Sequence, residues 1–492
     1  MTTRPDAYVG IEMSPTSEQP SDPLADSAAA VSVIRLRGNI GFFQYLALGF
    51  GTIIGSAWVI LLGDWLIKAG PGGAIFGFAC GGAVMVVVGA CYAELTTLIP
   101  HAGSEFIYAY EVYGRRVAFV VGWFLALYLV SVTIFEGLAL AWIVEVALPS
   151  WLSPGAQGVV SAKVSSLGLS VSVACALTIL GLNYCSARRA VVLHSILTYG
   201  FLATVIVVLS DLLIHGRFGN ALPAFATVND APWWVGSAAI FAFCAYALMG
   251  FQTIPQTVEE RSERIGLKSV ASAMIASIVA AAVFYCLIVF CVSVARPWRS
   301  LVTTPFPVVT ATLFLPQGHL LAIALLAATV ASLFKTWNGI FMQAARLLVA
   351  MSRVGFVPLK IARLDGRFQS PAGALVIVAA LNICGLFLGK AAIQPIADMA
   401  AMMLTLAYIM CCATVLLMRR QGKVGLYRVP GGLPVIVAGG VGSGIMAVAA
   451  LIAPFWEQKG RVPLEWKLLG IWSVLGIVIW YGWVRRRSGI QA

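Results

Sequence analysis

Three glycines interrupt the first long apolar segment of the chain, where an ordinary membrane helix would carry leucine. Residues 49–57 read GFGTIIGSA, and glycine loses more backbone freedom in a helix than any other residue. A helix that breaks inside a bilayer exposes N–H and C=O groups, which is tolerated only where they face a cavity or a ligand. The segment therefore predicts a binding site at membrane depth.

A second interruption of the same kind lies at residues 243–252, which read FCAYALMGFQ and precede Pro255. Secondary transporters build their central site from broken helices that occupy corresponding positions in two halves of the chain. The N–H groups at such a break favour an anionic group, and the carbonyl groups favour a cation. We expect the two breaks to form one site.

Charged side chains inside apolar segments are further candidates, because a charge buried in a membrane is costly and usually functional. Lys335 lies in the middle of the segment 319–351. A lysine that snorkels to the interface, or that pairs with Glu136 or Asp398, would equally explain it. Glu136 is itself deep enough in its segment to need a partner. Asp64, near the outer end of the first segment, suits an outer gate and interfacial anchoring equally well.

Twelve apolar segments are long enough to cross a bilayer, which takes about 20 residues. They lie near 42–68, 72–99, 117–147, 166–184, 188–214, 232–258, 268–294, 319–351, 371–389, 392–418, 431–453 and 466–484. Breaks that are five segments apart, in opposite orientations, predict an all-α integral membrane fold with a 5+5 inverted repeat. The repeats would cover about 42–214 and 232–418, followed by two extra helices at about 431–484. Residues 101–113 predict a short interfacial helix.

Composition agrees with a protein that is solvated by lipid. The 492 residues are 60% hydrophobic and 11% charged, with a mean hydropathy of +0.92, and no soluble domain of this length is so apolar. The net charge of +12 invites a nucleic-acid interpretation. However, the basic residues gather in alternate connections, for example at 419–428 and 485–487. This positive-inside pattern argues against nucleic acid and predicts that both termini are cytoplasmic.

Few other residues suggest chemistry. The ten cysteines lie in or beside apolar segments without a CxxC pair, which favours free thiols over metal ligands or disulfides. The sequence has no Ser/His/Asp constellation, phosphate loop or metal-ligand spacing, so we expect no enzyme, no cofactor and no metal. Residues 1–33 are rich in Pro, Ser, Asp and Ala and lack the apolar core of a signal peptide. They predict a disordered cytoplasmic tail before a transporter domain at 34–488.

In their order and spacing, these motifs resemble the amino acid–polyamine–organocation (APC) superfamily of permeases. The first span of that group usually reads GxxIGSGIF, and residues 51–59 read GTIIGSAWV. Its sixth span usually carries GF(D/E) followed by a Glu-Glu pair, which residues 250–252 and 259–260 match. Residues 338–339, 346–355 and 428–432 also fit, and the resemblance runs from about residue 38 to residue 484.

The resemblance implies a secondary transporter that moves amino acids or related amines by alternating access. The substrate-binding residues that it implies are Ile53, Gly55, Ser56, Ala57, Tyr246, Met249 and Gly250. The N–H groups of Ser56 and Ala57 would hold the substrate carboxylate, and carbonyl groups near Ile53, Tyr246 and Met249 would hold its ammonium group. Ala57 stands where the family usually has glycine, so its methyl group narrows the approach to the backbone. The alternative is that Gly51 and Gly55 form a small-residue contact between helices.

The resemblance also bears on coupling. In sodium-coupled relatives the eighth span helps to line a cation site, and in some sodium-independent members a lysine of the fifth span fills it. The fifth-span position is apolar here, so we hypothesise that the Lys335 ammonium replaces the sodium ion and cycles a proton. Gln252 stands where the family usually has an acid, so pH sensing at that position is not expected. For Glu94 and Glu105, the resemblance and the proximity of Arg115 favour ion pairs of a gate or loop over a role in transport.

A membrane sensor that binds an amino acid without net transport is the alternative function, although the short loops offer no signalling domain. Sodium independence is favoured, because a lysine near a sodium site would repel the ion. Proton coupling and substrate exchange both stay open. We expect a monomer or homodimer in the plasma membrane, specifically a bacterial inner membrane, with a small molecule, lipid and protons as its partners.

Overall fold

The computed structural model describes residues 39–152, 164–185, 187–226, 232–368, 370–457 and 462–485. The tail predicted at 1–33 lies outside these ranges and stays a prediction. Within the described residues the regular structure is helical, and the only β-type pairing is an isolated bridge between Ile40 and Arg261. The all-α fold class expected from the sequence is therefore confirmed for the part of the chain described.

The helices of the first half are α2 (Phe42–Ile53), α3 (Ala57–Ile60), α4 (Leu62–Leu98), α5 (Glu105–Leu152), α6 (Ser166–Cys185), α7 (Ala187–His215) and η1 (Phe218–Ala221). Those that follow are α8 (Trp233–Ala247), α9 (Thr253–Gln256), η2 (Val258–Glu260), α10 (Leu267–Ala295), α11 (Trp298–Leu301), α12 (Pro307–Leu313) and α13 (Gly318–Arg353). The last are α14 (Leu359–Ala362), α15 (Ala372–Leu386), η3 (Lys390–Ala392), α16 (Ile393–Arg420), α17 (Gly432–Glu457), α18 (Leu464–Ile479) and η4 (Trp480–Val484).

Two long helices each contain a sharp bend that separates a short piece from a span. In α4 the bend is at Gly70, with φ +71°, and Pro71 follows it. A positive φ favours glycine, and proline is well suited to begin the next helical segment. The bend therefore marks the boundary between the first two predicted spans. In α5 the bend is at Gly114, with φ +79°, which sets off the segment predicted as an interfacial helix.

Ten helices among the described residues are long and apolar enough to cross a membrane, which makes this a multi-pass membrane protein. Two shorter apolar helices, Trp233–Ala247 and Ala372–Leu386, accompany them. Each has 15 residues, so it is about 23 Å long against a bilayer core of about 30 Å. The predicted count of twelve spans requires both of these helices to cross. For α8 the shortness has a local cause, since the second break ends it early.

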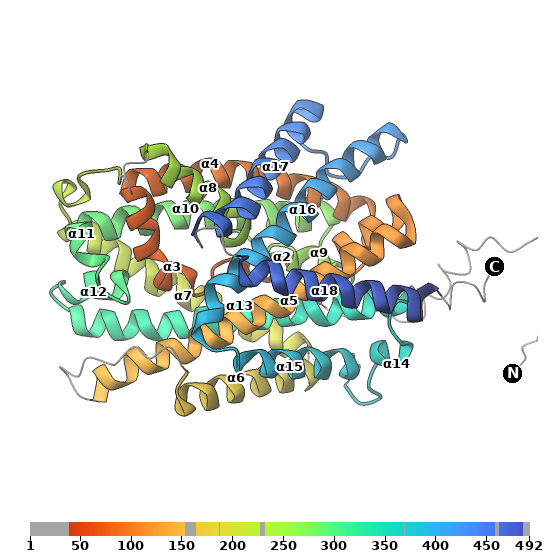
Figure 1. The fold of residues 1–492 in the computed structure, drawn as a ribbon, viewed down its shortest axis with the longest axis horizontal. Coiled ribbons are helices and arrows are strands. Elements are labelled where there is room, and N and C mark those ends of the chain that lie inside the picture. Colours follow the sequence, from red (N-terminus) through yellow and green to blue (C-terminus); the bar gives the residue numbers. More distant parts are fainter. Residues whose placement is uncertain are drawn as a thin grey trace, which may run out of the picture. The chain divides into compact units, whose positions relative to one another are not determined.

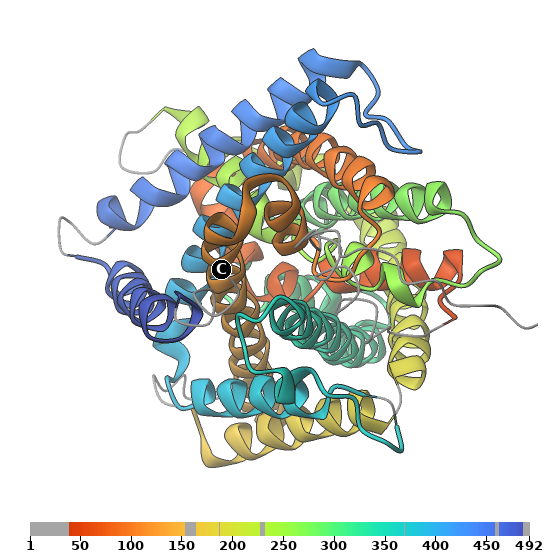
Figure 2. The same ribbon diagram turned by 90° about the vertical axis from the view of Figure 1, so that its right-hand side faces the viewer.

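Helix α13 occupies the interior of the bundle and packs against α2, α5 and α7. The view along the bundle in Figure 2 shows α13 surrounded by other helices. In contrast, α6 and α15 pack together at one edge in both views (Figures 1 and 2). Helix α18 buries only Glu465 and Gly476, as expected of a helix whose surface faces lipid. The interior position of α13 allows it to reach both helix breaks.

Candidate functional site

The first break separates α2 from α3 at the place that the glycines predict. Helix α2 ends at Ile53, and Ile54 is extended with φ −89° and ψ 93° before α3 begins at Ala57. At Gly55 a Cβ atom would overlap Oε1 of Glu136, so a larger residue there would force that buried carboxylate to move. Gly51 instead approaches α7, where a Cβ would overlap Oγ1 of Thr198. Gly51 therefore makes the small-residue contact between helices that was the alternative interpretation of these glycines. Gly55 instead faces a carboxylate.

The second break lies between α8, which ends at Ala247, and α9, which begins at Thr253. Gly250 in this break has φ +109°. A Cβ atom on it would lie 2.8 Å from the carbonyl oxygen of Thr52, in the last turn of α2. Glycine is thus needed for both the backbone conformation and the close approach. The two breaks lie directly against each other.

Helix α13 holds the carbonyl groups that the first break leaves without helical partners. The Lys335 ammonium donates to the carbonyl oxygens of Gly51 at 2.8 Å and Ile54 at 2.5 Å. The Thr336 hydroxyl donates to the same two carbonyls at 2.9 and 3.1 Å. Ser332 Oγ donates to the Ile54 carbonyl at 2.7 Å. This set of bonds satisfies the end of α2, where the last carbonyls of a helix always need outside partners.

Lys335 is fully buried, with none of its surface exposed. Its ammonium lies 4.7 Å from the ring centre of Phe201 on α7, which adds a cation–π contact to its two carbonyl bonds. The lysine therefore does not snorkel to an interface. Its hydrogen bonds go to backbone carbonyls of the first break and not to Glu136.

Glu136, on α5, finds its partner in the first break. Its carboxylate accepts a hydrogen bond from Ser56 Oγ at 3.0 Å. The side chain is almost completely buried, with 2% of its surface exposed. A carboxylate of the protein thus lies beside Gly55 and Ser56, two of the residues that the resemblance assigned to the substrate.

A cavity lies where the two breaks, α5, α10 and α13 meet. Its lining residues are Ile53, Gly55, Ala57, Phe135, Glu136, Tyr246, Ala247, Met249, Tyr285 and Thr336. About 240 Å³ of space lies between the lining atoms, open solvent included, and little of it is wide enough for a water molecule. That is room for about one water molecule. The site is contracted in this conformation and must open to admit an organic substrate.

The seven predicted substrate-binding residues divide into two groups. Five of them line the cavity, namely Ile53, Gly55, Ala57, Tyr246 and Met249. Ser56 and Gly250 are not among the lining residues, since Ser56 bonds with Glu136 and Gly250 packs on Thr52. The hydroxyl of Tyr246 is buried without a hydrogen-bond partner. A buried hydroxyl without a partner is costly, so this group is available to a ligand.

Four lining residues were not predicted. Three of them directly precede or follow, in the sequence, a residue that the sequence analysis had proposed: Phe135 beside Glu136, Ala247 beside Tyr246, and Thr336 beside Lys335. Tyr285, on α10, has no local motif that distinguishes it. Only the packing of α10 against α4 and α2 brings it to the site.

Gln252 and Asp64 lie outside the cavity lining. Gln252 accepts the N–H of Gly250 at 2.8 Å and donates to the hydroxyl of Tyr408 at 3.2 Å. Its amide therefore stabilises the second break and ties it to α16. Asp64 forms a partly exposed ion pair with Lys68 at 3.0 Å, one helical turn away.

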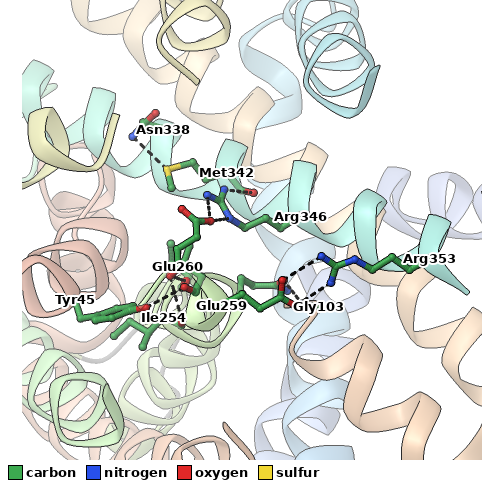
Figure 3. A network of polar contacts seen from close by, with 12 residues as sticks. Tyr45, Gly103, Ile254, Glu259, Glu260, Asn338, Met342, Arg346 and Arg353 are labelled. Atoms are coloured by element: carbon green, nitrogen blue, oxygen red, sulfur yellow. Dashed lines mark hydrogen bonds and ion pairs between the residues drawn. The ribbon is translucent and has the colours of Figure 1, made fainter. Parts of the chain in front are cut away.

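A polar cluster joins the segment after the second break to α13 (Figure 3). Glu259 pairs with Arg353, with N–O distances of 2.8 and 3.1 Å, and Glu260 accepts from Arg346 Nε at 2.6 Å. Glu259 also accepts the backbone N–H of Ala102 at 2.8 Å, from the connection before α5. The cluster fixes η2 and α13 to each other at one end of the site.

Glu94 forms an ion pair, as expected, whereas Glu105 accepts a hydrogen bond from a hydroxyl group. The buried carboxylate of Glu94 accepts from Arg419 Nε at 2.8 Å and Nη2 at 2.6 Å, which joins the ends of α4 and α16. Glu105 accepts from the hydroxyl of Tyr92 at 2.9 Å. Arg115 donates to the carbonyl of Val354 at 3.1 Å and stacks on the ring of Phe356. Arg115 thus pairs with neither carboxylate, and the partner of Glu94 comes from a helix that is distant in the sequence.

The sequence is similar to those of known amino acid permeases and transporters. A family model described as amino acid permease matches residues 40–480. The chain is 25% identical over 407 residues to the glutamate/serine transporter AimA of Bacillus subtilis (strain 168), covering 80% of this chain and 73% of that protein. It is 24% identical over 472 residues to the branched-chain amino acid permease BcaP of Lactococcus lactis subsp. cremoris (strain MG1363), covering 90% and 94%. It is 21% identical over 483 residues to a methylthioribose transporter of Bacillus subtilis (strain 168), covering 96% and 98%.

Proposed function

The chain belongs to the amino acid permease family, within the APC superfamily, and from this premise we propose that it is a secondary active transporter of amino acids or related amines. It works by alternating access around the two helix breaks, in the plasma membrane and with both termini cytoplasmic. The relatives are named as transporters and permeases and not as enzymes. Their names give the sensor alternative no support.

The observation that carries this proposal is the meeting of two broken helices at one small cavity lined by buried residues. A backbone carbonyl without a helical partner costs free energy inside an apolar bundle. Helix breaks at this depth are therefore expected only where they serve a binding site. Here the interruption of α2 is matched by that of α8, five predicted spans later. This correspondence supports a 5+5 inverted repeat with α17 and α18 as the two extra helices.

The cavity supports an occluded state of a transport cycle. It lies between the breaks, α5, α10 and α13, and it has room for about one water molecule. Alternating access requires these elements to separate on one side and then on the other. The cluster of Glu259, Glu260, Arg346 and Arg353 is placed to hold one side shut (Figure 3).

The contacts of Lys335 favour sodium-independent transport. Unwound carbonyls at the end of a half-helix are the groups that coordinate Na⁺ in sodium-coupled transporters. The carbonyls of Gly51 and Ile54 already bond to the Lys335 ammonium. A fixed positive charge at that point repels a second cation. Transport is therefore coupled to protons or proceeds by exchange.

Uptake into proteoliposomes tests the proposal. Purified protein is reconstituted and offered labelled amino acids and amines, with an imposed proton gradient and with or without sodium. The proposal predicts saturable accumulation inside the vesicles that is indifferent to sodium. Saturable binding without accumulation would instead support a sensor, and uptake that requires sodium would overturn the assignment of Lys335.

A further inference from the structure

We propose that the corner between α16 and α17 binds the phosphate headgroups of anionic phospholipids. This corner, residues 420–431, is called the basic corner below, and it lies at the periphery of the bundle in both views (Figures 1 and 2). It contributes no residue to the cavity lining, so the inference does not depend on the transported substrate. It follows from the fixed conformation of the basic corner, its charge, and its position at the end of an apolar helix face.

Helix α4 holds the basic corner in one conformation. The backbone N–H of Val429 donates to Oε2 of Glu94 at 2.8 Å, and the N–H of Tyr427 donates to Oγ1 of Thr97 at 3.2 Å. A Cβ atom on Gly425 would lie 2.4 Å from the same Thr97 oxygen, so glycine allows the close approach. A surface that is already ordered loses less conformational entropy when it binds a partner. The exposed side chains of the basic corner are therefore presented from a fixed backbone.

The basic corner carries positive charge without an acidic neighbour in the chain. Its three basic side chains are exposed and form no ion pair with a described residue, namely Arg420, Lys423 and Arg428. Arg419, just before them, already pairs with Glu94. No Asp or Glu occurs between residues 419 and 456. Anionic lipid attracts such clusters, because each Lys or Arg near the membrane surface adds to the affinity.

The basic corner lies where an apolar helix face ends. Exposed apolar side chains recur every three or four residues along α17, namely Leu433, Val437, Val441, Ile445 and Val448. In a membrane such a face contacts acyl chains, so the residues just before Leu433 lie near the level of the headgroups. Val424 and Leu426 are 43% and 61% exposed, and they can enter this boundary while the basic side chains reach the phosphates. These apolar side chains favour a phospholipid over free inorganic phosphate.

Thermal unfolding of the purified full-length protein in detergent measures this binding. The protein is titrated with soluble dihexanoyl phosphatidylglycerol, with dihexanoyl phosphatidylcholine, whose headgroup has no net charge, and with inorganic phosphate. Only phosphatidylglycerol should raise the melting temperature, because a ligand that binds the folded state stabilises it by mass action. Each basic side chain contributes about fivefold to the affinity. Replacing Arg420, Lys423 and Arg428 together with glutamine should therefore raise the lipid concentration at half-maximal effect about 100-fold.

The matched control replaces Lys360, Arg363 and Arg367 with glutamine, which removes the same charge from exposed positions on α14 and the loop after it. It should respond to phosphatidylglycerol as the unmodified protein does. If the triple variant of the basic corner does not fold, Lys423→Gln alone should lower the affinity about fivefold. Equal responses of the two triple variants, or an equal response to phosphatidylcholine or phosphate, would overturn the inference. Because no transport is measured, these outcomes are independent of the proposed function.

Discussion

Replacing Lys335 with methionine removes a buried charge while preserving most of the side-chain volume. The ammonium makes two hydrogen bonds to the carbonyls of Gly51 and Ile54. Hydrogen bonds to a charged group contribute about 1.5–3 kcal/mol each, so about 3–6 kcal/mol of attraction is lost between α13 and α2. Relief from burying the ammonium offsets much of this loss. Thr336 and Ser332 still bond to the same carbonyls. We therefore expect stability to change by less than about 2 kcal/mol.

Transport should respond more strongly than stability. Alternating access moves α13 relative to the first break, so the Lys335 bonds differ between the conformations of the cycle. If one of the two bonds forms in only one conformation, its loss in Lys335→Met shifts the conformational equilibrium by about 1.5–3 kcal/mol. This corresponds to about a 10- to 100-fold change in the ratio of the two populations. The initial rate of uptake should fall by a comparable factor. The pH dependence of uptake should flatten, since the hypothesis gives this ammonium the proton that is cycled.

Initial uptake rates across a pH series, with and without sodium, measure these effects. Lys335→Ala extends the test, because it vacates space beside the oxygens of Gly51, Ile54 and Thr336 that could admit a sodium ion. Sodium should then stimulate the alanine variant. Lys360→Met, at an exposed position on α14, is the control and should behave as the unmodified protein. A normal rate with unchanged pH dependence in Lys335→Met would refute the reasoning.

Three further substitutions probe the rest of the site. Gly55→Ala brings a methyl group onto Oε1 of Glu136, so it should destabilise the protein by about 1–3 kcal/mol and abolish uptake. Arg346→Met leaves the buried carboxylate of Glu260 without its cation, which should cost about 3–5 kcal/mol in thermal unfolding. Tyr246→Phe removes a buried hydroxyl that has no partner. It should leave stability equal or higher, while substrate affinity falls about tenfold, the loss of about one hydrogen bond.

Each of these predictions has an outcome that contradicts it. Full uptake by Gly55→Ala would mean that Glu136 does not approach the first break so closely. An unchanged melting temperature for Arg346→Met would show that the ion pair of Figure 3 contributes little to the folded state. Unchanged affinity in Tyr246→Phe would show that the substrate does not use the hydroxyl.

The positions of the helix breaks were predictable because glycine and proline act on the chain locally. The sequence placed one break at 49–57 and the other at 243–252, and the structure ends α2 at Ile53 and α8 at Ala247. Gly70 and Pro71 similarly set the boundary between the first two predicted spans. These features depend on backbone conformation, which a short stretch of sequence determines.

The partners of the charged residues were much less predictable. Lys335 stood out because a charge in an apolar segment is rare, yet the sequence could not choose between carbonyls and carboxylates as its partners. Glu94 pairs with Arg419, which is distant in the sequence. Tyr285 reaches the cavity only through the packing of α10. Such contacts depend on how whole helices pack, and residue spacing within one helix does not encode that.

Substrate counterflow measures the central claim most directly, since it detects a site that faces each side of the membrane in turn. Proteoliposomes loaded with an unlabelled amino acid or amine that the uptake assay identifies as a substrate are diluted into a trace of its labelled form. Our account predicts transient accumulation of label above the external concentration, which is lost in Gly55→Ala. Labelled substrate that binds to the protein but never accumulates inside the vesicles would contradict alternating access through the paired breaks.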